Sequence, residues 1–153
     1  RRIPRDPKLR IMNRRFVILF LYLGILMGIL VLGTFFWKLK SLGWSYGDPL
    51  SSDSPVLIEA SAFAFTTLVI IQLFKAFNAR SLTHSIFGLK PLWHLWGANL
   101  ISLLMVLAIV YLPALQRLFH TTSLPFFDWV IVVGTGVLVL IIEEIRKAIM
   151  RRK

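Results

Sequence analysis

The amino-acid sequence predicts an all-α membrane protein, folded as a bundle of four transmembrane helices. Hydrophobic residues make up 57% of the 153-residue chain, and the mean hydropathy is +0.74. They gather in four long blocks, whereas the apolar residues of a soluble domain are spread periodically along the chain. The formal net charge of +11 is concentrated at the two ends, where basic segments flank the apolar blocks as they do in membrane proteins.

The first block follows a basic segment at residues 1–15, which holds 7 of the 18 Lys and Arg residues. We assign this segment to the cytoplasmic side. Residues 16–37 read FVILFLYLGILMGILVLGTFFW and carry no charge. A membrane-spanning helix needs about 20 such residues, so the block predicts the first span. Within it, Gly24 and Gly28 form a GxxxG pair, which either lets a second helix approach closely or arises by chance in a glycine-containing span.

Residues 56–78 and 92–112 predict the second and third spans. The second block has Glu59 near its start and Lys75 near its end, positions from which a long charged side chain can reach the membrane interface. The third block contains no Asp, Glu, Lys or Arg, and Pro113 follows it directly. Because proline interrupts helical hydrogen bonding, we expect the third helix to end there.

The fourth block, residues 129–142, is too short to cross a membrane unless its helix continues into the charged sequence EEIRKAIM. Continuation gives sufficient length and places Glu143 and Glu144 within reach of Lys147 at helical spacing. The two glutamates could instead form an acid/base pair, but their basic neighbours favour an ion-paired helix end. The predicted four-helix domain therefore covers residues 16–150, with spans at about 16–37, 56–78, 92–112 and 129–150.

An even number of spans places both ends of the chain on one side of the membrane. With four spans, that side holds 15 Lys and Arg residues and the opposite side holds 3. Lys and Arg are retained in cytoplasmic segments, so the asymmetry predicts cytoplasmic termini. We thus expect an integral, multi-pass protein that contacts membrane lipid. We do not expect a nucleic-acid partner, because the basic residues are not interleaved with stacking aromatic side chains.

The sequence offers few residues for catalysis. It contains no cysteine, no nucleophile–base arrangement and no glycine-rich phosphate-binding loop, so we assign no catalytic or cofactor-binding residue in this chain. No two of its 3 histidines share a helical face at four-residue spacing, which argues against a common metal site. Polar side chains inside a span either bond a neighbouring helix or line an ion path. The spans contain Gln72, Asn78 and Asn99.

Two segments resemble P-type cation-transporting ATPases of the calcium-pump branch. RRIPRDPKLRIMNRR resembles the cytoplasmic loop before the seventh membrane helix of those pumps, where an Arg-Pro-Pro-Arg-x-Pro-like motif is common, although Ile3 replaces one proline. AFTTLVIIQLFKAFNARS resembles their eighth helix, with Lys75 where asparagine is usual. The residues that fit are Arg2, Pro4, Arg5 and Pro7 in the first motif and Thr67, Gln72, Asn78 and Ser81 in the second.

Two later segments, VYLPALQRLFHTTSLPFFDW and EEIRK, are similar to the connection between the ninth and tenth helices and to the end of the tenth. The resemblance implies that the chain is the C-terminal transmembrane region, helices seven to ten, of an ATP-driven cation pump, with Ca²⁺ as the expected ion. Its partners would be the remaining helices and the cytoplasmic domains, where ATP and Mg²⁺ would act in an aspartyl-phosphate cycle. The motifs of that cycle are absent from this chain.

The resemblance also makes Gln72 a candidate cation-path ligand. In pumps that carry two calcium ions, the matching position can be a glutamate that donates an oxygen atom to one site, and glutamine is common in relatives that carry one ion. A neutral amide oxygen is a weaker ligand for a hard dication than a carboxylate. Lys75, one turn away, either directs its charge towards that region or extends to the cytoplasmic interface.

Two other functions are compatible with a four-span chain. One is a self-standing membrane protein that regulates or assembles with a pump, which the start of its reading frame would distinguish from a region of a pump. The other is a channel-forming oligomer, which requires polar residues repeated along one span, whereas here they are isolated. The transported ion is a further open choice, because calcium, manganese, sodium and proton-coupled pumps share the general layout of this region.

Overall fold

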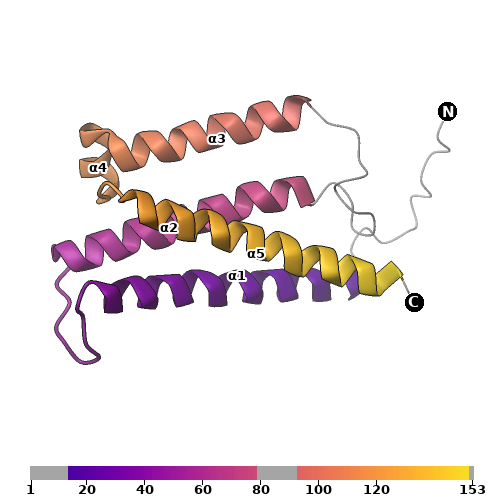
Figure 1. Cartoon of the computed structure of the whole chain (residues 1–153), viewed down its shortest axis with the longest axis horizontal. Coiled ribbons are helices and arrows are strands. Elements are labelled where there is room, and N and C mark those ends of the chain that lie inside the picture. The colour runs from indigo at the N-terminus through magenta and orange to yellow at the C-terminus, as the bar shows by residue number, and fades with distance from the viewer. Residues whose placement is uncertain (1–13, 79–92, 152–153) are drawn as a thin grey trace.

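The computed structural model describes residues 14–78 and 93–151, and within these ranges the chain forms helices and no strand. Four helices are long and apolar enough to cross a membrane, at Val17–Ser41, Pro55–Ala76, Trp93–Tyr111 and Phe126–Ile149. The predicted all-α bundle of four membrane helices is therefore confirmed (Figure 1). The complete helices are α1 (Arg14–Ser41), α2 (Pro55–Asn78), α3 (Trp93–Tyr111), α4 (Pro113–Phe119) and α5 (Phe126–Arg151).

α1 and α5 extend beyond their predicted apolar blocks into charged residues. α1 continues past Trp37 and has Lys38 and Lys40 in its last turn. α5 begins before Trp129, with Asp128 in its first turn, and runs through the EEIRKAIM segment. The fourth span therefore reaches membrane-crossing length by continuing into charged sequence, as the sequence predicts.

α2 is the central helix of the bundle. It packs against α1, α3 and α5, and Figure 1 shows the long helices side by side, with consecutive spans running in opposite directions. α1 begins and α5 ends at one end of the bundle, which we call the terminal end. The α1–α2 loop and α4 lie at the opposite end, which we call the loop end.

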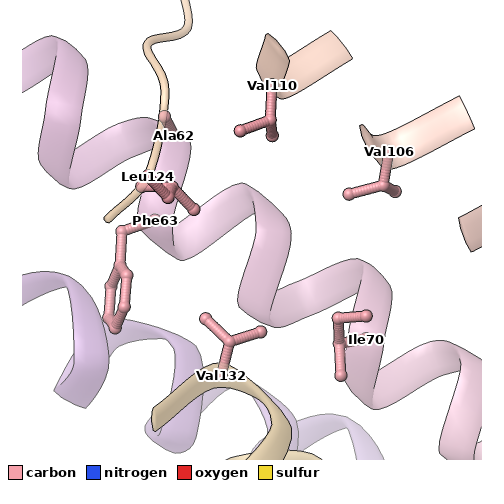
Figure 2. Close-up of a cluster of buried hydrophobic side chains, with 7 residues drawn as sticks. All are labelled: Ala62, Phe63, Ile70, Val106, Val110, Leu124 and Val132. Atoms are coloured by element: carbon pink, nitrogen blue, oxygen red, sulfur yellow. The ribbon is translucent and has the colours of Figure 1, made fainter. Parts of the chain in front are cut away.

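The interior of the bundle is built from apolar side chains that surround α2. Because lipid chains are as apolar as these residues, close packing rather than escape from water holds the helices together. A small cluster of Met27, Ile71 and Val139 joins α1, α2 and α5. The main cluster joins α2 to α3, α5 and the segment before α5 (Figure 2), through Ala62, Phe63, Ile70, Val106, Val110, Leu124 and Val132.

A close contact between α2 and α5 is made at Gly136. A Cβ atom at this position would lie 2.6 Å from Cδ2 of Phe74 and 3.2 Å from Cγ2 of Ile70, so a larger residue would require α2 or its side chains to move. At Gly24 and Gly28, by contrast, an added Cβ atom would meet no heavy atom within 4 Å. The GxxxG pair of α1 thus makes no close helix contact within the described part of the chain.

A short helix that was not predicted from the sequence, α4, lies between α3 and α5. Pro113 lies in the first turn of α4, where a missing N–H and a fixed φ are tolerated. His120 ends the helix with a φ of 49°, in the left-handed region. The connection to α5 is held by hydrogen bonds from Tyr111 Oη to the Leu124 carbonyl (3.0 Å) and from Trp129 Nε1 to Tyr111 Oη (2.8 Å).

Candidate functional site

At the loop end, one lysine joins three helices. The Lys38 ammonium of α1 lies 2.8 Å from Glu59 Oε1 on α2 and 2.7 Å from Asp128 Oδ2 on α5. Their side-chain exposures are 7% for Lys38, 4% for Asp128 and 28% for Glu59. The ammonium also lies 5.7 Å from the centre of the Phe63 ring, within cation–π range. We call Lys38, Glu59 and Asp128 the Lys38 network.

The Lys38 network was not predicted from the sequence, because its members come from three separate helices. The positions of the three charges in the sequence nevertheless indicated that they could pair. Each of the three charges lies at the end of a predicted span, and all three ends are on the same predicted side of the membrane. Since a lone charge next to hydrocarbon is costly, charges at one depth favour mutual pairing. The network fastens the loop ends of α1, α2 and α5 to one another.

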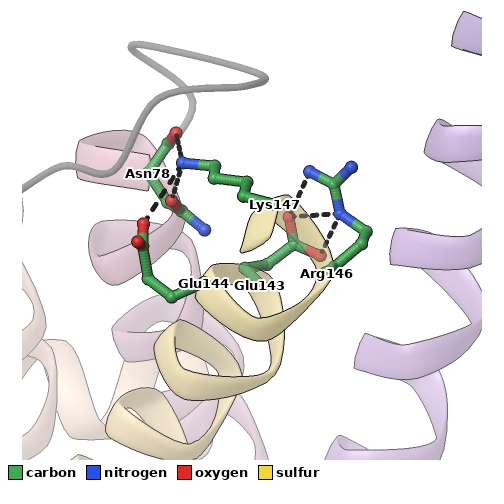
Figure 3. Close-up of polar contacts among 5 residues, drawn as sticks. All are labelled: Asn78, Glu143, Glu144, Arg146 and Lys147. Atoms are coloured by element: carbon green, nitrogen blue, oxygen red, sulfur yellow. Dashed lines mark hydrogen bonds and ion pairs between the residues drawn. The ribbon is translucent and has the colours of Figure 1, made fainter. Parts of the chain in front are cut away.

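At the terminal end, Lys147 fastens α5 to the last residue of α2 (Figure 3). Its ammonium donates to the side-chain oxygen of Asn78 and, at 3.0 Å, to the Asn78 carbonyl. It also lies 3.4 Å from Glu144 Oε1, and the Lys147 side chain is 1% exposed. A cation at a helix C-terminus satisfies a carbonyl that has no partner within the helix and interacts favourably with the helix dipole.

The predicted ion-paired end of α5 is present, with one difference in the pairing. Arg146 Nη2 lies 2.9 Å from Glu143 Oε2, and Lys147 pairs with Glu144 as predicted. The predicted pairing of Glu143 with Lys147 is wrong. The Lys147 ammonium turns instead to the two oxygen atoms of Asn78 on α2, which are buried acceptors that need a donor.

Asn99 is the second amide that joins α2 to a neighbouring helix. Its Nδ2 atom, on α3, donates to the Leu73 carbonyl of α2 at 3.3 Å. Asn78 and Asn99 therefore both bond across a helix interface, one of the two roles expected for polar residues inside spans.

Unlike Asn78 and Asn99, Gln72 lies on an exposed face of α2. Its side chain is exposed, and its amide nitrogen lies 4.0 Å from Met27 Sδ of α1, which is a weak acceptor. Ser61 and Leu68 are also exposed, and they lie on the same face about three turns and one turn before Gln72. We call Ser61, Leu68 and Gln72 the open α2 face.

Lys75 lies about one turn after Gln72, and its side chain crosses towards α1. The ammonium lies 3.7 Å from the same Met27 Sδ atom that Gln72 approaches, and the side chain is partly buried. The Lys75 side chain therefore brings its charge to the region of Gln72 and does not extend away from it towards the membrane interface.

A metal site formed by acidic and histidine side chains is not found in the described ranges, where no group of three or more His, Cys, Asp or Glu residues could hold a metal ion. His94 is exposed at the start of α3, and His120 is exposed at the end of α4. His84 lies outside the described residues. Gln72, the candidate ligand from the sequence, has no acidic neighbour among the contacts that the structure gives it.

Comparison with known proteins identifies the family. The family described as "Cation transporting ATPase, C-terminus" matches residues 1–149. The chain belongs to this family. A calcium-transporting ATPase of Bacillus subtilis (strain 168) is 42% identical over 80 residues, which are 51% of this chain and 9% of the relative. A calcium-transporting ATPase of Plasmodium falciparum (isolate K1 / Thailand) is 37% identical over 109 residues, which are 69% of this chain and 9% of the relative.

A third relative aligns along the whole chain. Calcium-transporting ATPase type 2C member 1 of Homo sapiens is 30% identical over 155 residues, which are 100% of this chain and 16% of the relative. The chain thus spans only 9% to 16% of the length of these ATPases. It is a C-terminal, multi-pass membrane region of the P-type cation-transporting ATPase family, and the resemblance predicted from the sequence motifs is confirmed.

In this ATPase region, the residues that match the eighth-helix motif point in two directions. Thr67 and Asn78 lie about three turns apart on the inner face of α2, where both are buried. The Thr67 hydroxyl donates to the Phe63 carbonyl at 2.8 Å. Gln72 lies about 140° around the helix from Thr67, so it leaves the packed interior. Ser81 lies outside the described residues.

Proposed function

We propose that this four-helix region supports the ion-carrying helices of a P-type ATPase that transports Ca²⁺. The support is the family match over residues 1–149 and the similarity to relatives named calcium-transporting ATPases. Other parts of the pump would use ATP and Mg²⁺ in the aspartyl-phosphate cycle. The role of this region is to hold α2 in a fixed position and to present one polar face to the helices that carry the ion.

The observation that carries the proposal is the contrast between the two sides of α2. On one side it packs against α1, α3 and α5, and it is tied at its two ends by Lys38 and Lys147. On the other side, Gln72 is exposed within the span Pro55–Ala76. An amide that faces lipid without a partner costs on the order of a few kcal/mol, so the open α2 face favours a further protein surface.

We propose that the further surface consists of the ion-carrying helices, and that Gln72 is a ligand on the cation path. Its amide oxygen can coordinate a cation or accept a hydrogen bond from a helix that bears the main ligands. Because an amide is a weaker ligand than a carboxylate, the proposed contribution of Gln72 is secondary to that of acidic residues elsewhere in the pump.

Substitution of Gln72 tests this role in the complete ATPase. We expect Gln72→Ala to lower the apparent Ca²⁺ affinity without loss of protein, and Gln72→Glu to shift that affinity because it adds a charge beside the ion. Gln72→Leu should behave like Gln72→Ala. The measurement is ATP-dependent Ca²⁺ uptake into sealed vesicles as a function of free Ca²⁺ concentration.

Asn99→Ala provides the matched control for Gln72. It removes an amide that bonds the Leu73 carbonyl across a helix interface, so it should lower the thermal stability and leave the Ca²⁺ affinity unchanged. If the three Gln72 variants also change only stability, Gln72 joins helices and does not line the cation path.

We further propose that the terminal end is cytoplasmic, on the asymmetry of 15 basic residues against 3. These 153 residues contain no cysteine, so no native thiol of this region adds to the labelling of an introduced cysteine. Cysteines at Ser52 and Ser123, both exposed at the loop end, should react with an impermeant maleimide added to the non-cytoplasmic side of sealed membranes. A cysteine at Thr83, in the segment between the second and third spans, should react only after permeabilisation. The reverse labelling pattern would contradict the orientation.

A further inference from the structure

A groove opens between α1 and α5 near the terminal end of the bundle. Its volume of about 490 Å³ is in the range of ligand pockets. Both helices pack against α2, and nearer the middle of the bundle Met27 of α1 and Val139 of α5 belong to one buried cluster. The groove begins beyond that cluster, and its lining residues are Tyr22 of α1 and Ile142, Ile145, Arg146 and Ile149 of α5.

The groove combines apolar walls with polar groups close to the membrane surface. Ile145 and Ile149 remain 55% and 58% exposed, so the apolar side of the groove is open. Arg146 lies about 5 Å along α5 from Ile149, where the fourth span ends. Tyr22 lies about 8 Å inside the first span, which begins at Val17. These depths correspond to the interface between lipid headgroups and acyl chains.

Both polar groups of the groove can donate hydrogen bonds. The Tyr22 hydroxyl has no partner among the described residues, and a hydroxyl inside a span needs one because water is scarce there. Arg146 Nη2 lies 2.9 Å from Glu143 Oε2, and Figure 3 shows the guanidinium on the side of α5 nearest α1. A guanidinium has five N–H donors in a planar fork, which suits phosphate oxygen atoms as well as carboxylates.

Positive charge is concentrated in the segments that adjoin the groove. Residues 1–15, which lead into α1, contain 7 Lys and Arg residues, and residues 146–153, at the end of α5, contain 5. The acidic residues of these segments and of the adjoining turn of α5 are Asp6, Glu143 and Glu144. Basic pockets between membrane helices bind anionic headgroups, so the charge at this end of the bundle favours an anionic lipid as the occupant.

We propose that the groove between α1 and α5 binds one anionic phospholipid, with its phosphate at Arg146 and one acyl chain against the isoleucines. The Tyr22 hydroxyl donates to an ester carbonyl of this lipid, which lies deeper in the membrane than the phosphate. The bound lipid bridges α1 and α5 at the terminal end. This inference goes beyond the proposed function, because it does not depend on the transported ion.

Lipid binding to the purified complete ATPase tests the proposal. The probes are phosphatidylglycerol and phosphatidylcholine with identical acyl chains, and native mass spectrometry counts the bound lipids as a function of concentration. We expect one site that binds phosphatidylglycerol at least fivefold more tightly than phosphatidylcholine. Arg146→Gln should reduce this preference to less than twofold, whereas Arg146→Lys, which keeps the charge, should retain it. Glycerol phosphate, which lacks acyl chains, should not compete.

Filling the groove tests its apolar side while the Glu143–Arg146 pair is kept. Ile145→Trp should lower the affinity of the site for both lipids at least fivefold, because the indole occupies the volume of the acyl chain. Ile101→Trp is the matched control, since Ile101 is 61% exposed on α3 and does not line the groove. It should leave lipid binding unchanged. Tyr22→Phe should weaken both lipids at least twofold and leave the preference between them unaltered.

A photoreactive lipid locates the site without any substitution. Phosphatidylglycerol with a diazirine on one acyl chain should label the unmodified ATPase near Tyr22 or between Ile142 and Ile149. Labelling of other parts of the pump alone would overturn the inference, as would equal phosphatidylglycerol binding by the unmodified, Arg146→Gln and Ile145→Trp proteins. If Ile145→Trp releases a co-purified membrane protein and lipid binding is unchanged, the groove holds a protein helix and the lipid assignment is wrong. Failure of the pump to transport Ca²⁺ would contradict the proposed function and leave these binding results unaffected.

Discussion

Replacing Lys38 with methionine is expected to lower the free energy of unfolding by about 3–5 kcal/mol, because two carboxylates then lose their counter-ion. The Asp128 side chain is 4% exposed and the Glu59 side chain is 28% exposed. Most of the destabilisation should therefore come from Asp128, which cannot recover hydration in place. The expected measurement is equilibrium unfolding of the purified protein by SDS in mixed micelles.

Lys40→Met is the matched control for Lys38→Met. Lys40 lies in the same last turn of α1 but is exposed, so its loss should change the unfolding free energy by no more than about 0.5 kcal/mol. Neutralising the partners as well, in a triple variant with Glu59→Gln and Asp128→Asn, should restore much of the lost stability. Equal effects of Lys38→Met and Lys40→Met would show that the Lys38 network does not hold the loop ends together.

Substituting alanine for Gly136 is expected to destabilise the bundle by about 1–3 kcal/mol, the usual cost of overpacking. The added Cβ atom would lie 2.6 Å from Cδ2 and 2.8 Å from Cε2 of Phe74, and 3.2 Å from Cγ2 of Ile70. Since these atoms lie on α2, the overlap forces α5 away from the central helix or displaces the Phe74 ring. The same unfolding assay measures the effect.

Gly134→Ala should raise the free energy of unfolding, whereas Gly136→Ala should lower it. Gly134 is in the same helix, two residues before Gly136, and an added Cβ atom there would meet no heavy atom within 4 Å. Only the gain in helix propensity remains, which stabilises by up to about 1 kcal/mol. Phe74→Leu, which shortens the overlapping ring, should reduce the cost of Gly136→Ala. If both glycine substitutions stabilise the protein, the α2–α5 contact is looser than the structure has it.

The number and type of the membrane helices were predictable from the sequence alone. Span length depends only on how many consecutive apolar residues cross the hydrocarbon, and this property is local. The same local rule predicted that α5 continues through charged residues, and it placed Gln72, Asn78 and Asn99 inside spans. The motif resemblance added the family, which the match over residues 1–149 confirms.

The roles of the polar residues were decided by the tertiary structure. Gln72, Asn78 and Asn99 are all amides in the predicted spans, and their local spacing does not separate them, although the motif resemblance marks Gln72 as a candidate ligand. Asn78 accepts from Lys147 of α5 and Asn99 donates to α2, whereas Gln72 faces away from the packed interior. The difference arises from the rotation of α2 about its own axis, which packing against three neighbours determines.

For the glycines and the charged residues too, the spacing was visible in the sequence, but the contacts were decided by the tertiary structure. The GxxxG spacing of Gly24 and Gly28 is visible in the sequence, yet the close helix contact of the described chain is made at Gly136. Glu143 and Lys147 have the spacing of an ion pair, yet Lys147 bonds Asn78 instead. By itself the sequence determined the composition, the spans and the helical spacings. Only the tertiary structure decided the partners, because a partner on another helix depends on how the helices are arranged around α2, and no local spacing encodes that arrangement.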